Sequence, residues 1–413
     1  MKHYRELILK YIENDYTKIL REPNGILQEK FLVPGACYKF ELWDWDSWLT
    51  DVAITQVAYD NNKLHEFFPY QKGCITNFLQ HMEEETGWTP ITITPKKCAP
   101  PFDKEELPNA IKPVLAQHAL FICKYNEDYS WMEPYYEQLK KYIQYYMNYC
   151  LHESGLFFFM DDGYIGVDND PCTFYRPRKS SASIFLNCLM YKEFLALASL
   201  AKQFAKAEDE AYYLQQAELL KEAVRTHCYD ERNGFYYSVD LDLLPIDPEQ
   251  WLHKGAPRHW NTLIRKIDVW SGFLAMWAGI ADEKQAERMV KENYLNEAVF
   301  CAPYGVRTLS KCEKMYRIIK SGNPSCWLGP IWGVSNYFVF RALLNYGYEE
   351  LAGELANKMI TLFGRDIEEC GEMHEYYDPE TGVGVNNQGF QSWNLLCANV
   401  IAWVEKRTTI TEC

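Results

Sequence analysis

The sequence predicts an all-α fold in which pairs of helices wind into a closed α/α toroid, as a single domain over residues 1–413. Segments with apolar residues at helical spacing recur in pairs along the chain. A short turn with glycine and aromatic residues follows several pairs, and the stretches SGLFFF, NGFYY and ETGVG are its most similar instances. No shift of composition divides the chain. The alternative, an open helical solenoid, should have repeats that resemble one another more closely.

The helices follow from the spacing of apolar residues. They are predicted over residues 1–22, 47–59, 67–84, 111–125, 131–150, 181–204, 208–226, 267–279, 282–293, 332–345, 349–363 and 390–404. The clearest is 208–226, where Tyr213, Ala217, Leu220 and Val224 mark one apolar face. Asp46 or Ser47 is expected to cap the helix over 47–59. The proline-rich residues 87–108 are predicted as loop.

Charge and cysteine usage exclude several classes of function. The net charge of −15 comes without a long basic run, which argues against nucleic-acid and anionic-membrane partners. The N-terminal residues show no apolar signal segment, and uninterrupted apolar runs are far shorter than the roughly 20 residues of a membrane span. The 14 cysteines are scattered without a CxxC pair, as in reduced proteins. We therefore expect a soluble cytoplasmic protein, either monomeric or homo-oligomeric.

A run of tryptophans and acids, WDWDS, occupies residues 43–47. In one interpretation Asp44 or Asp46 binds a pair of sugar hydroxyls while a tryptophan ring supports the face of the sugar. In the other, the tryptophans belong to the core and the acids cap the following helix. Aromatic residues make up 15% of the chain, with 30 Tyr and 13 Trp, which suits both interpretations.

Two acid-rich loops lie about two hundred residues apart. GYIGVDNDP, residues 163–171, contains Asp168, and GEMHEYYDPETGVGVNNQG, residues 371–389, contains Glu375. Two carboxylates facing each other across an aromatic pocket are typical of glycoside hydrolysis. HEYYD lacks the second histidine of a metal-binding helix, and no other spacing of metal ligands stands out, so no metal is expected. Phosphate-binding glycine loops and a GxSxG elbow are also absent from the sequence, and no cofactor is expected.

Four motifs together resemble one family. WDWDS, GVDNDP, GPIWGVSNYFVFRALLNYGY and HEYYDPETG, in this order, are similar to glycoside hydrolase family 63, and the last two also resemble trehalases. Counted together with Trp393, they span residues 43–393. The compact length is similar to that of the family's mannosylglycerate and glucosylglycerate hydrolases. The resemblance implies an (α/α)6 barrel that hydrolyses an α-glycosidic bond with inversion.

The resemblance also implies roles for individual residues. The general acid falls on Asp168 and the general base on Glu375. The family's usual Ser-Pro after the D-N pair is Asp170-Pro171 here, so Asp170 either raises the pKa of Asp168 or competes for its role. The remaining candidates are proposed to bind the sugar, and these are Asp46 as hydroxyl ligand, Trp43 and Trp45 as walls, Gln117 and Trp332 as further contacts, and Trp393 as floor.

Arg176, in FYRPRKSS, is a candidate for the leaving-group side. Its planar guanidinium could hold the carboxylate of a glycerate group while Asp168 protonates the glycosidic oxygen. The alternative is a structural arginine paired with Asp170 or another nearby acid.

We therefore expect an inverting, metal-independent α-glycosidase that acts on a small α-glucoside or α-mannoside, such as glucosylglycerate or mannosylglycerate. Three alternatives remain open. A neutral, trehalase-like α-glucosidic disaccharide hydrolase would need no carboxylate site. A sugar epimerase or isomerase typically uses paired histidines, whereas the nine histidines here, His374 apart, lie away from these motifs. A non-catalytic sugar-binding or helical scaffold protein would not need both Asp168 and Glu375.

Overall fold

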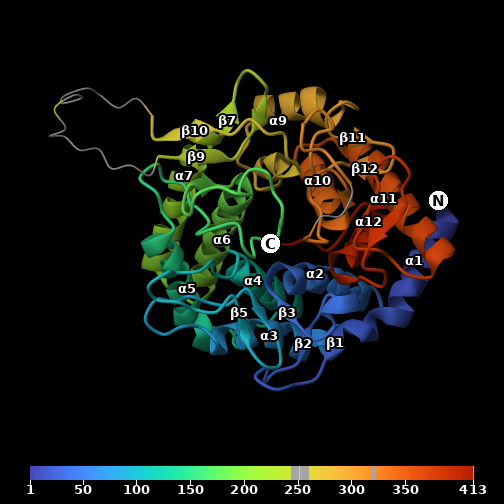
Figure 1. Cartoon of the computed structure of the whole chain (residues 1–413). Coiled ribbons are helices and arrows are strands. Elements are labelled where there is room, and N and C mark those ends of the chain that lie inside the picture. Colours follow the sequence, from blue (N-terminus) through green and yellow to red (C-terminus); the bar gives the residue numbers. More distant parts are fainter. Residues whose placement is uncertain (243–250, 252–259, 319–321, 413) are drawn as a thin grey trace.

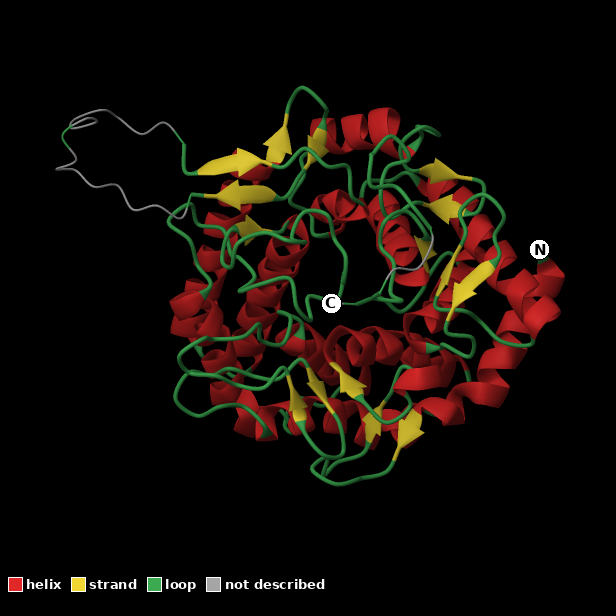
Figure 2. Ribbon diagram, in the orientation of Figure 1, coloured by secondary structure: helices red, strands yellow, loops and turns green. Residues whose placement is uncertain are grey.

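The computed structural model describes the whole chain except residues 243–250, 252–259, 319–321 and 413. Helices surround a central axis and form a helical barrel-like toroid, with short strands in the loops (Figures 1 and 2). The predicted all-α toroid is therefore confirmed at this level. The stretches predicted as turns are turns or hairpins in the structure, including the ETGVG hairpin, in which Gly382 has a φ of +72°.

Within the described residues, six α-helices form the inner layer. Each contacts the next in chain order, and the last contacts the first, so the layer is closed. These helices are α2 (Asp44–Asp60), α4 (Leu115–Asn126), α6 (Ile184–Gln203), α8 (Leu274–Trp277), α10 (Gly333–Asn345) and α12 (Cys397–Lys406). Inner helices are surrounded by protein, and α2 is accordingly buried at nearly every position.

The other α-helices cover the inner layer from outside (Figure 1). They are α1 (Lys2–Asp15), α3 (Leu64–Gln80), α5 (Tyr136–Tyr149), α7 (Ala207–Cys228), α9 (Glu283–Arg288) and α11 (Glu349–Cys370). α7 packs along α6, and α11 packs against α10 and α12. The predicted apolar stripe of α7, from Tyr213 to Val224, is buried. The amphipathic pattern of α7 is the one expected of a helix in the outer layer, with one face towards the core and the other towards solvent.

Short antiparallel sheets fill the loops, and three of those formed by the described residues have three strands. These are β3–β4–β5 (Leu42–Trp43, Thr92–Ile93 and Cys98–Ala99), β6–β9–β10 (Ser181–Ala182, Val239–Leu241 and Thr262–Ile264) and β13–β14–β15 (Ile331–Trp332, Tyr376–Tyr377 and Gly384–Asn386). In the part of the chain that the structure describes, there are also three two-stranded ladders: β1–β2 (Leu20–Arg21 and Phe31–Leu32), β7–β8 (Tyr229–Asp230 and Phe235–Tyr236) and β11–β12 (Cys301–Ala302 and Gly305–Val306). In each three-stranded sheet one strand leads into an inner helix: β3 into α2, β6 towards α6 and β13 into α10. The sheets therefore hold the loops at the N-terminal ends of inner helices.

Some predicted boundaries were wrong. The helix predicted over 47–59 begins at Asp44, with Trp43 at the N-cap, so neither Asp46 nor Ser47 caps it. Ser47 instead donates its hydroxyl to the carbonyl of Asp44. Only Trp270–Phe273 (a 3-10 turn) and α8 are helical within residues 267–279. Strand β3 ends at Trp43, directly before α2, and an isolated bridge between Val269 and Leu309 precedes the 3-10 turn at Trp270.

The C-terminal residues enter the ring, where the buried carboxylate of Glu412 accepts hydrogen bonds from Trp277 Nε1 (2.8 Å) and Arg341 Nε (3.0 Å). Helix α6 is long and apolar enough to cross a membrane by length and composition, but 83% of its apolar window is buried inside the protein. Core helices commonly have this composition. All thirteen cysteines among the described residues are free thiols, as predicted.

Candidate active site

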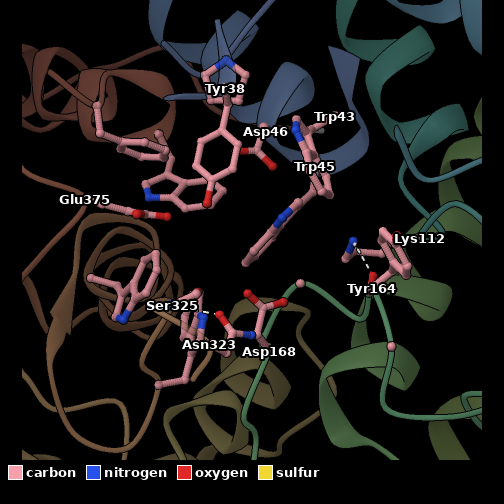
Figure 3. A pocket seen from close by; sticks show the side chains of 17 residues that line it. Tyr38, Trp43, Trp45, Asp46, Lys112, Tyr164, Asp168, Asn323, Ser325 and Glu375 are labelled. Atoms are coloured by element: carbon pink, nitrogen blue, oxygen red, sulfur yellow. Dashed lines mark hydrogen bonds between the residues drawn. The ribbon is translucent and has the colours of Figure 1, made fainter. Parts of the chain in front are cut away.

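A cavity of about 260 Å³ opens among the loops at the N-terminal ends of α2 and α10. Segments far apart in the sequence meet there (Figure 3). Most of its wall is aromatic, with a few carboxylates and amides. The lining residues are Pro34, Tyr38, Trp43, Trp45, Asp46, Lys112, Gly163, Tyr164, Gly166, Asp168, Asn323, Ser325, Trp327, Trp332, Glu375, Phe390 and Trp393. Apolar walls with a few converging polar groups are typical of small-molecule sites.

The structure brings most of the predicted site residues together in this cavity. Those that line it are Asp168, Glu375, Asp46, Trp43, Trp45, Trp332 and Trp393. Gln117 and Arg176 do not line it, and both are engaged elsewhere.

The prediction for Gln117 was wrong. This residue is fully buried in α4, and its side-chain Nε2 donates to the carbonyls of Pro113 (2.7 Å) and Leu189 (3.1 Å). Leu189 belongs to α6. Gln117 therefore ties two neighbouring inner helices together, because it lies on the face of α4 that packs against α6.

The placement of Arg176 at the leaving group was also wrong. Its Nε and Nη2 contact the two carboxylate oxygens of Asp240 at 3.1 and 2.9 Å. Arg265 contacts the same carboxylate. The alternative of a structural arginine paired with a nearby acid therefore holds, with Asp240 of β9 as the acid.

Because Arg176 binds Asp240, the substitution Arg176→Lys is expected to affect charged and neutral substrates equally. The ion pair is partly exposed, so its loss should cost no more than about 1 kcal/mol of stability. The measurement is kcat/KM on a glycosylglycerate and on a neutral aryl α-glycoside. A loss confined to the glycosylglycerate would contradict the assignment and return Arg176 to the substrate site.

Asp168 reaches the cavity from the loop between α5 and α6 and is half-buried there. Burial raises the pKa of its carboxyl group above the ordinary value, while hydrogen bonds with Ser325 and Asn323 and the charge of Lys112 oppose the rise. The loop is anchored next to it, because Asn169 accepts a hydrogen bond from the backbone of Trp327 at 2.7 Å. A raised pKa favours a carboxyl group that keeps a proton to donate.

Asp170, the other acid of the GVDNDP motif, does not line this cavity. Its carboxylate is buried under the loop, where it accepts a hydrogen bond from the backbone N–H of Cys172 (3.1 Å). Burial raises the pKa of Asp170 to about 6. Of the two acids, Asp168 is the one that can meet a ligand in the cavity.

Glu375 stands directly before β14 on the hairpin that follows α11. Its backbone N–H donates to the carbonyl of Asn386 (2.9 Å), and the Asn386 side-chain amide donates to Glu375 Oε2 (2.8 Å). Only 3% of the residue is exposed. An amide donor stabilises negative charge on a carboxylate. In Figure 3, Asp168 and Glu375 point into the cavity from different sides, with aromatic rings around them.

Asp46 lies in the first turn of α2, and its Oδ1 accepts a hydrogen bond from the hydroxyl of Ser392 (3.0 Å). Burial, followed by the charge of Asp44, raises the pKa of Asp46 well above its ordinary value. Asp44 itself forms a buried ion pair, with Lys112 Nζ 3.0 Å from both of its carboxylate oxygens. This pair fixes the loop before α4 against the start of α2, beside the ring of Trp45.

Stacked tryptophans make the aromatic wall rigid. Trp327 and Trp332 lie parallel with ring centroids 4.0 Å apart, and Trp332 stacks on Tyr376 at 5.0 Å. Trp45 and Trp393 meet at 5.0 Å on another part of the wall. Such flat apolar surfaces suit the face of a sugar ring.

The sequence prediction missed ten of the lining residues: Pro34, Tyr38, Lys112, Gly163, Tyr164, Gly166, Asn323, Ser325, Trp327 and Phe390. Tyr38 stands five residues before Trp43 in the same aromatic run, and Trp327 stands just before the GPIWG motif. The aromatic runs carried a signal for these two residues. Lys112, Asn323 and Ser325 reach the cavity through contacts distant in sequence, such as the Lys112–Asp44 pair.

The prediction that no spacing of metal ligands occurs was also incomplete. Asp366, Cys370 and His374 each offer one ligand atom, and these atoms lie within 4.8 Å of one another. The three residues do not line the cavity. Their spacing was not recognised because it combines a helix and the turn that follows it.

The chain matches the mannosylglycerate hydrolase MGH1-like glycoside hydrolase domain over residues 39–393. It therefore belongs to this family of glycoside hydrolases, and the resemblance to glycoside hydrolase family 63 and the related trehalases is confirmed. The family therefore places the protein in the class of enzymes that hydrolyse glycosidic bonds.

Individual relatives agree with this class. The chain is 26% identical over 214 residues to a mannosylglycerate hydrolase of Rubrobacter radiotolerans, covering 51% of this chain and 41% of the relative. It is 25% identical over 276 residues to a cytosolic neutral trehalase of Kluyveromyces lactis, and the match covers 63% of this chain and 33% of the trehalase. The chain thus spans less than half the length of these curated relatives. The crystal structure of the Thermus thermophilus family 63 mannosylglycerate hydrolase with Tris and D-glycerate has the same fold, with a TM-score of 0.67 and 16% identity over 96% of this chain and 99% of that one.

Proposed function

We propose that this protein is an inverting α-glycosidase that cleaves a small α-glucoside or α-mannoside, using Asp168 as general acid and Glu375 as general base. The observation that carries the proposal is the presence of both carboxylates in one aromatic-lined cavity. Their surroundings differ: burial raises the pKa of Asp168 although Ser325, Lys112 and Asn323 oppose the rise, and Glu375 accepts a hydrogen bond from the amide of Asn386. Carboxyl groups with different environments are suited to opposite proton-transfer roles.

The cleavage needs two simultaneous events. Asp168 gives its proton to the glycosidic oxygen, so the aglycone leaves as an alcohol. Glu375 takes a proton from a water molecule that attacks the anomeric carbon from the opposite face. Inversion of configuration follows from this attack, and it requires the two carboxyl groups to be roughly 6.5–9.5 Å apart.

The other cavity residues bind the sugar. Asp46 faces the cavity at the start of α2 and accepts hydrogen bonds from sugar hydroxyls, while Trp43, Trp45, Trp332 and Trp393 surround the ring. No metal ion takes part in these steps. The proposed steps need a proton donor, a proton acceptor and water, and Asp168 and Glu375 supply the first two.

We further propose that residues 1–413 form one catalytic domain with an (α/α)6 architecture. Support comes from the inner layer of α2, α4, α6, α8, α10 and α12, each preceded or followed by an outer helix. A cytoplasmic location is proposed as well, since the described cysteines are free thiols and relatives include a cytosolic trehalase.

Two substrate classes are supported by different observations. The family and the Rubrobacter relative favour a glycosylglycerate. The charges favour a neutral α-glucosidic disaccharide as second candidate: among the described residues lining the cavity the cation is Lys112, and Asp44 already neutralises it. The carboxylate of a glycosylglycerate bound in the cavity would therefore gain little binding energy from Lys112.

Incubation with a panel of glycosides tests the proposed function. The panel contains glucosylglycerate, mannosylglycerate, trehalose and aryl α- and β-glycosides, and released monosaccharide is measured for the wild type and for Glu375→Gln. We expect release from at least one α-linked compound by the wild type, and release that is lower by a factor of about 10²–10⁴ by the variant. Release from β-linked compounds alone, or equal release by both proteins, would refute the proposal.

A further inference from the structure

The end of α11 brings three different metal-binding side chains together. Asp366 and Cys370 are four residues apart and so lie on one face of the helix. Gly371, with a φ of +77°, ends the helix and reverses the chain, so that His374 returns to Asp366. The Nδ1 atom of His374 lies 3.0 and 2.9 Å from the two carboxylate oxygens of Asp366.

The three ligand types select the class of cation. A thiolate and an imidazole prefer Zn²⁺ and similar soft or borderline ions, whereas Ca²⁺ and Mg²⁺ prefer oxygen ligands alone. The ligand atoms lie within 4.8 Å of one another, close enough for one ion to reach them after small shifts. Cys370 is exposed and gives the ion access from solvent, while Asp366 is buried.

A tyrosine outside the three ligands holds the carboxylate of Asp366 in place. Tyr377 donates its hydroxyl to Asp366 Oδ2 at 2.8 Å. Partners of this kind orient a ligating side chain before the metal arrives and increase its affinity. The carboxylate of Asp366 therefore has the fixed direction that an isolated surface acid lacks.

The cluster is coupled to the proposed base through the same carboxylate. Asp366 Oδ2 also accepts the backbone N–H of His374 at 2.8 Å, and Glu375 is the next residue. The carbonyl of His374 accepts a hydrogen bond from Asn394 at 2.7 Å. A movement of Asp366 or His374 thus acts directly on the backbone that positions Glu375.

Binding of a cation requires such a movement. A tetrahedral ion with bonds of roughly 2.0–2.2 Å to nitrogen and oxygen separates these two ligands by roughly 3.4 Å. His374 Nδ1 and Asp366 are 2.9–3.0 Å apart, so they must separate by a few tenths of an ångström. The ion bonds to Cys370 Sγ, a carboxylate oxygen of Asp366 and Nδ1 of His374. The thiol proton passes to solvent. The proton that Nδ1 donates to Asp366 leaves Nδ1 by exchange with solvent and Nε2 takes one up, so the ring stays neutral.

We propose that Asp366, Cys370 and His374 form a site for a thiophilic divalent cation such as Zn²⁺, and that its occupation inhibits hydrolysis by displacing Glu375. The site is separate from the catalytic cavity, and the cation is an inhibitor and not a cofactor. The binding part of this proposal is independent of the proposed function, whereas the inhibition part rests on it.

Binding is tested with Cd²⁺, whose bond to a thiolate gives an ultraviolet charge-transfer absorption. We expect this absorption in the wild type, its displacement by Zn²⁺, and its loss in Cys370→Ser. The matched control is Cys312→Ser, which removes another exposed thiol, one that donates to the carbonyl of Ala298. A Cd²⁺ signal that survives in Cys370→Ser, or one that is lost equally in Cys312→Ser, would overturn the site.

Inhibition is tested on the same proteins with an α-glycoside cleaved by the wild type. Zn²⁺ is expected to lower the rate of the wild type and of Cys312→Ser about tenfold, because a small misplacement of a catalytic group is costly. EDTA should restore the rate, and Cys370→Ser should keep its full rate in Zn²⁺. Equal inhibition of Cys370→Ser would overturn the coupling. If no glycoside is cleaved at all, the proposed function fails while the Cd²⁺ result still decides the site.

Discussion

Asp168→Asn is expected to lower kcat by about 10²–10⁴-fold without unfolding the protein, because general acid catalysis contributes this much. Glu375→Gln should cause a loss of similar size. Both substitutions keep the volume of the side chain and remove its proton chemistry. Steady-state kinetics on an α-glycoside with a poor leaving group gives the size of the loss, and a thermal or denaturant melt establishes that each variant is folded.

Asp170→Asn is the matched control, since Asp170 is next but one in sequence and buried outside the cavity. Its catalytic loss should be much smaller. The pH profile gives a second check: the acid must be protonated, so the rate should fall as pH rises through the raised pKa of Asp168. The pKa of Asp46 is raised as well, so the fall in rate at high pH could come from either residue. If Asp168 is the acid, this fall must be absent from the pH profile of Asp168→Asn. A nearly normal Asp168→Asn together with an inactive Asp170→Asn would reverse the assignment.

Lys112→Met is expected to destabilise the protein by about 3–5 kcal/mol, because it leaves the carboxylate of Asp44 buried without a counter-charge. The side chains of Lys112 and Asp44 are 1% and 0% exposed. Asp44 would keep its bonds from the backbone N–H groups of Trp45 and Lys112, which do not replace a full charge. Denaturant unfolding measures the loss of stability.

Two comparisons isolate the buried charge as the cause. The double variant Asp44→Asn/Lys112→Met removes both charges and should recover much of the loss. Lys104→Met breaks an ion pair with Glu85 in which both side chains are 69% exposed, and it should change stability by less than about 1 kcal/mol. A Lys112→Met variant as stable as Lys104→Met would show that the buried pair contributes little.

The segments that build the site were predictable from local composition. Trp43, Trp45 and Asp46 come from one aromatic and acidic run, and Asp168 and Glu375 from two polar loops beside apolar helices. Loops held by packed helices often carry functional groups, so their chemical composition was informative. The same reasoning predicted the alternation of helices and hairpins around the ring.

The direction of individual side chains was not predictable in this way. Arg176 is eight residues from Asp168, yet its guanidinium binds Asp240, which is 64 residues further along the chain. Gln117 turns towards α6 because it lies on the face of α4 that packs against this helix. Lys112 reaches the cavity by pairing with Asp44, 68 residues earlier. Such partners depend on tertiary packing, which no local pattern records.

The anomeric configuration of the first-formed sugar tests the central claim most directly. Proton NMR during hydrolysis of an α-linked substrate distinguishes the anomers before mutarotation mixes them. An acid at Asp168 and a base at Glu375 that directs water to the opposite face must release the β-anomer first. Initial release of the α-anomer would contradict the account, because retention needs a nucleophile that bonds to the sugar.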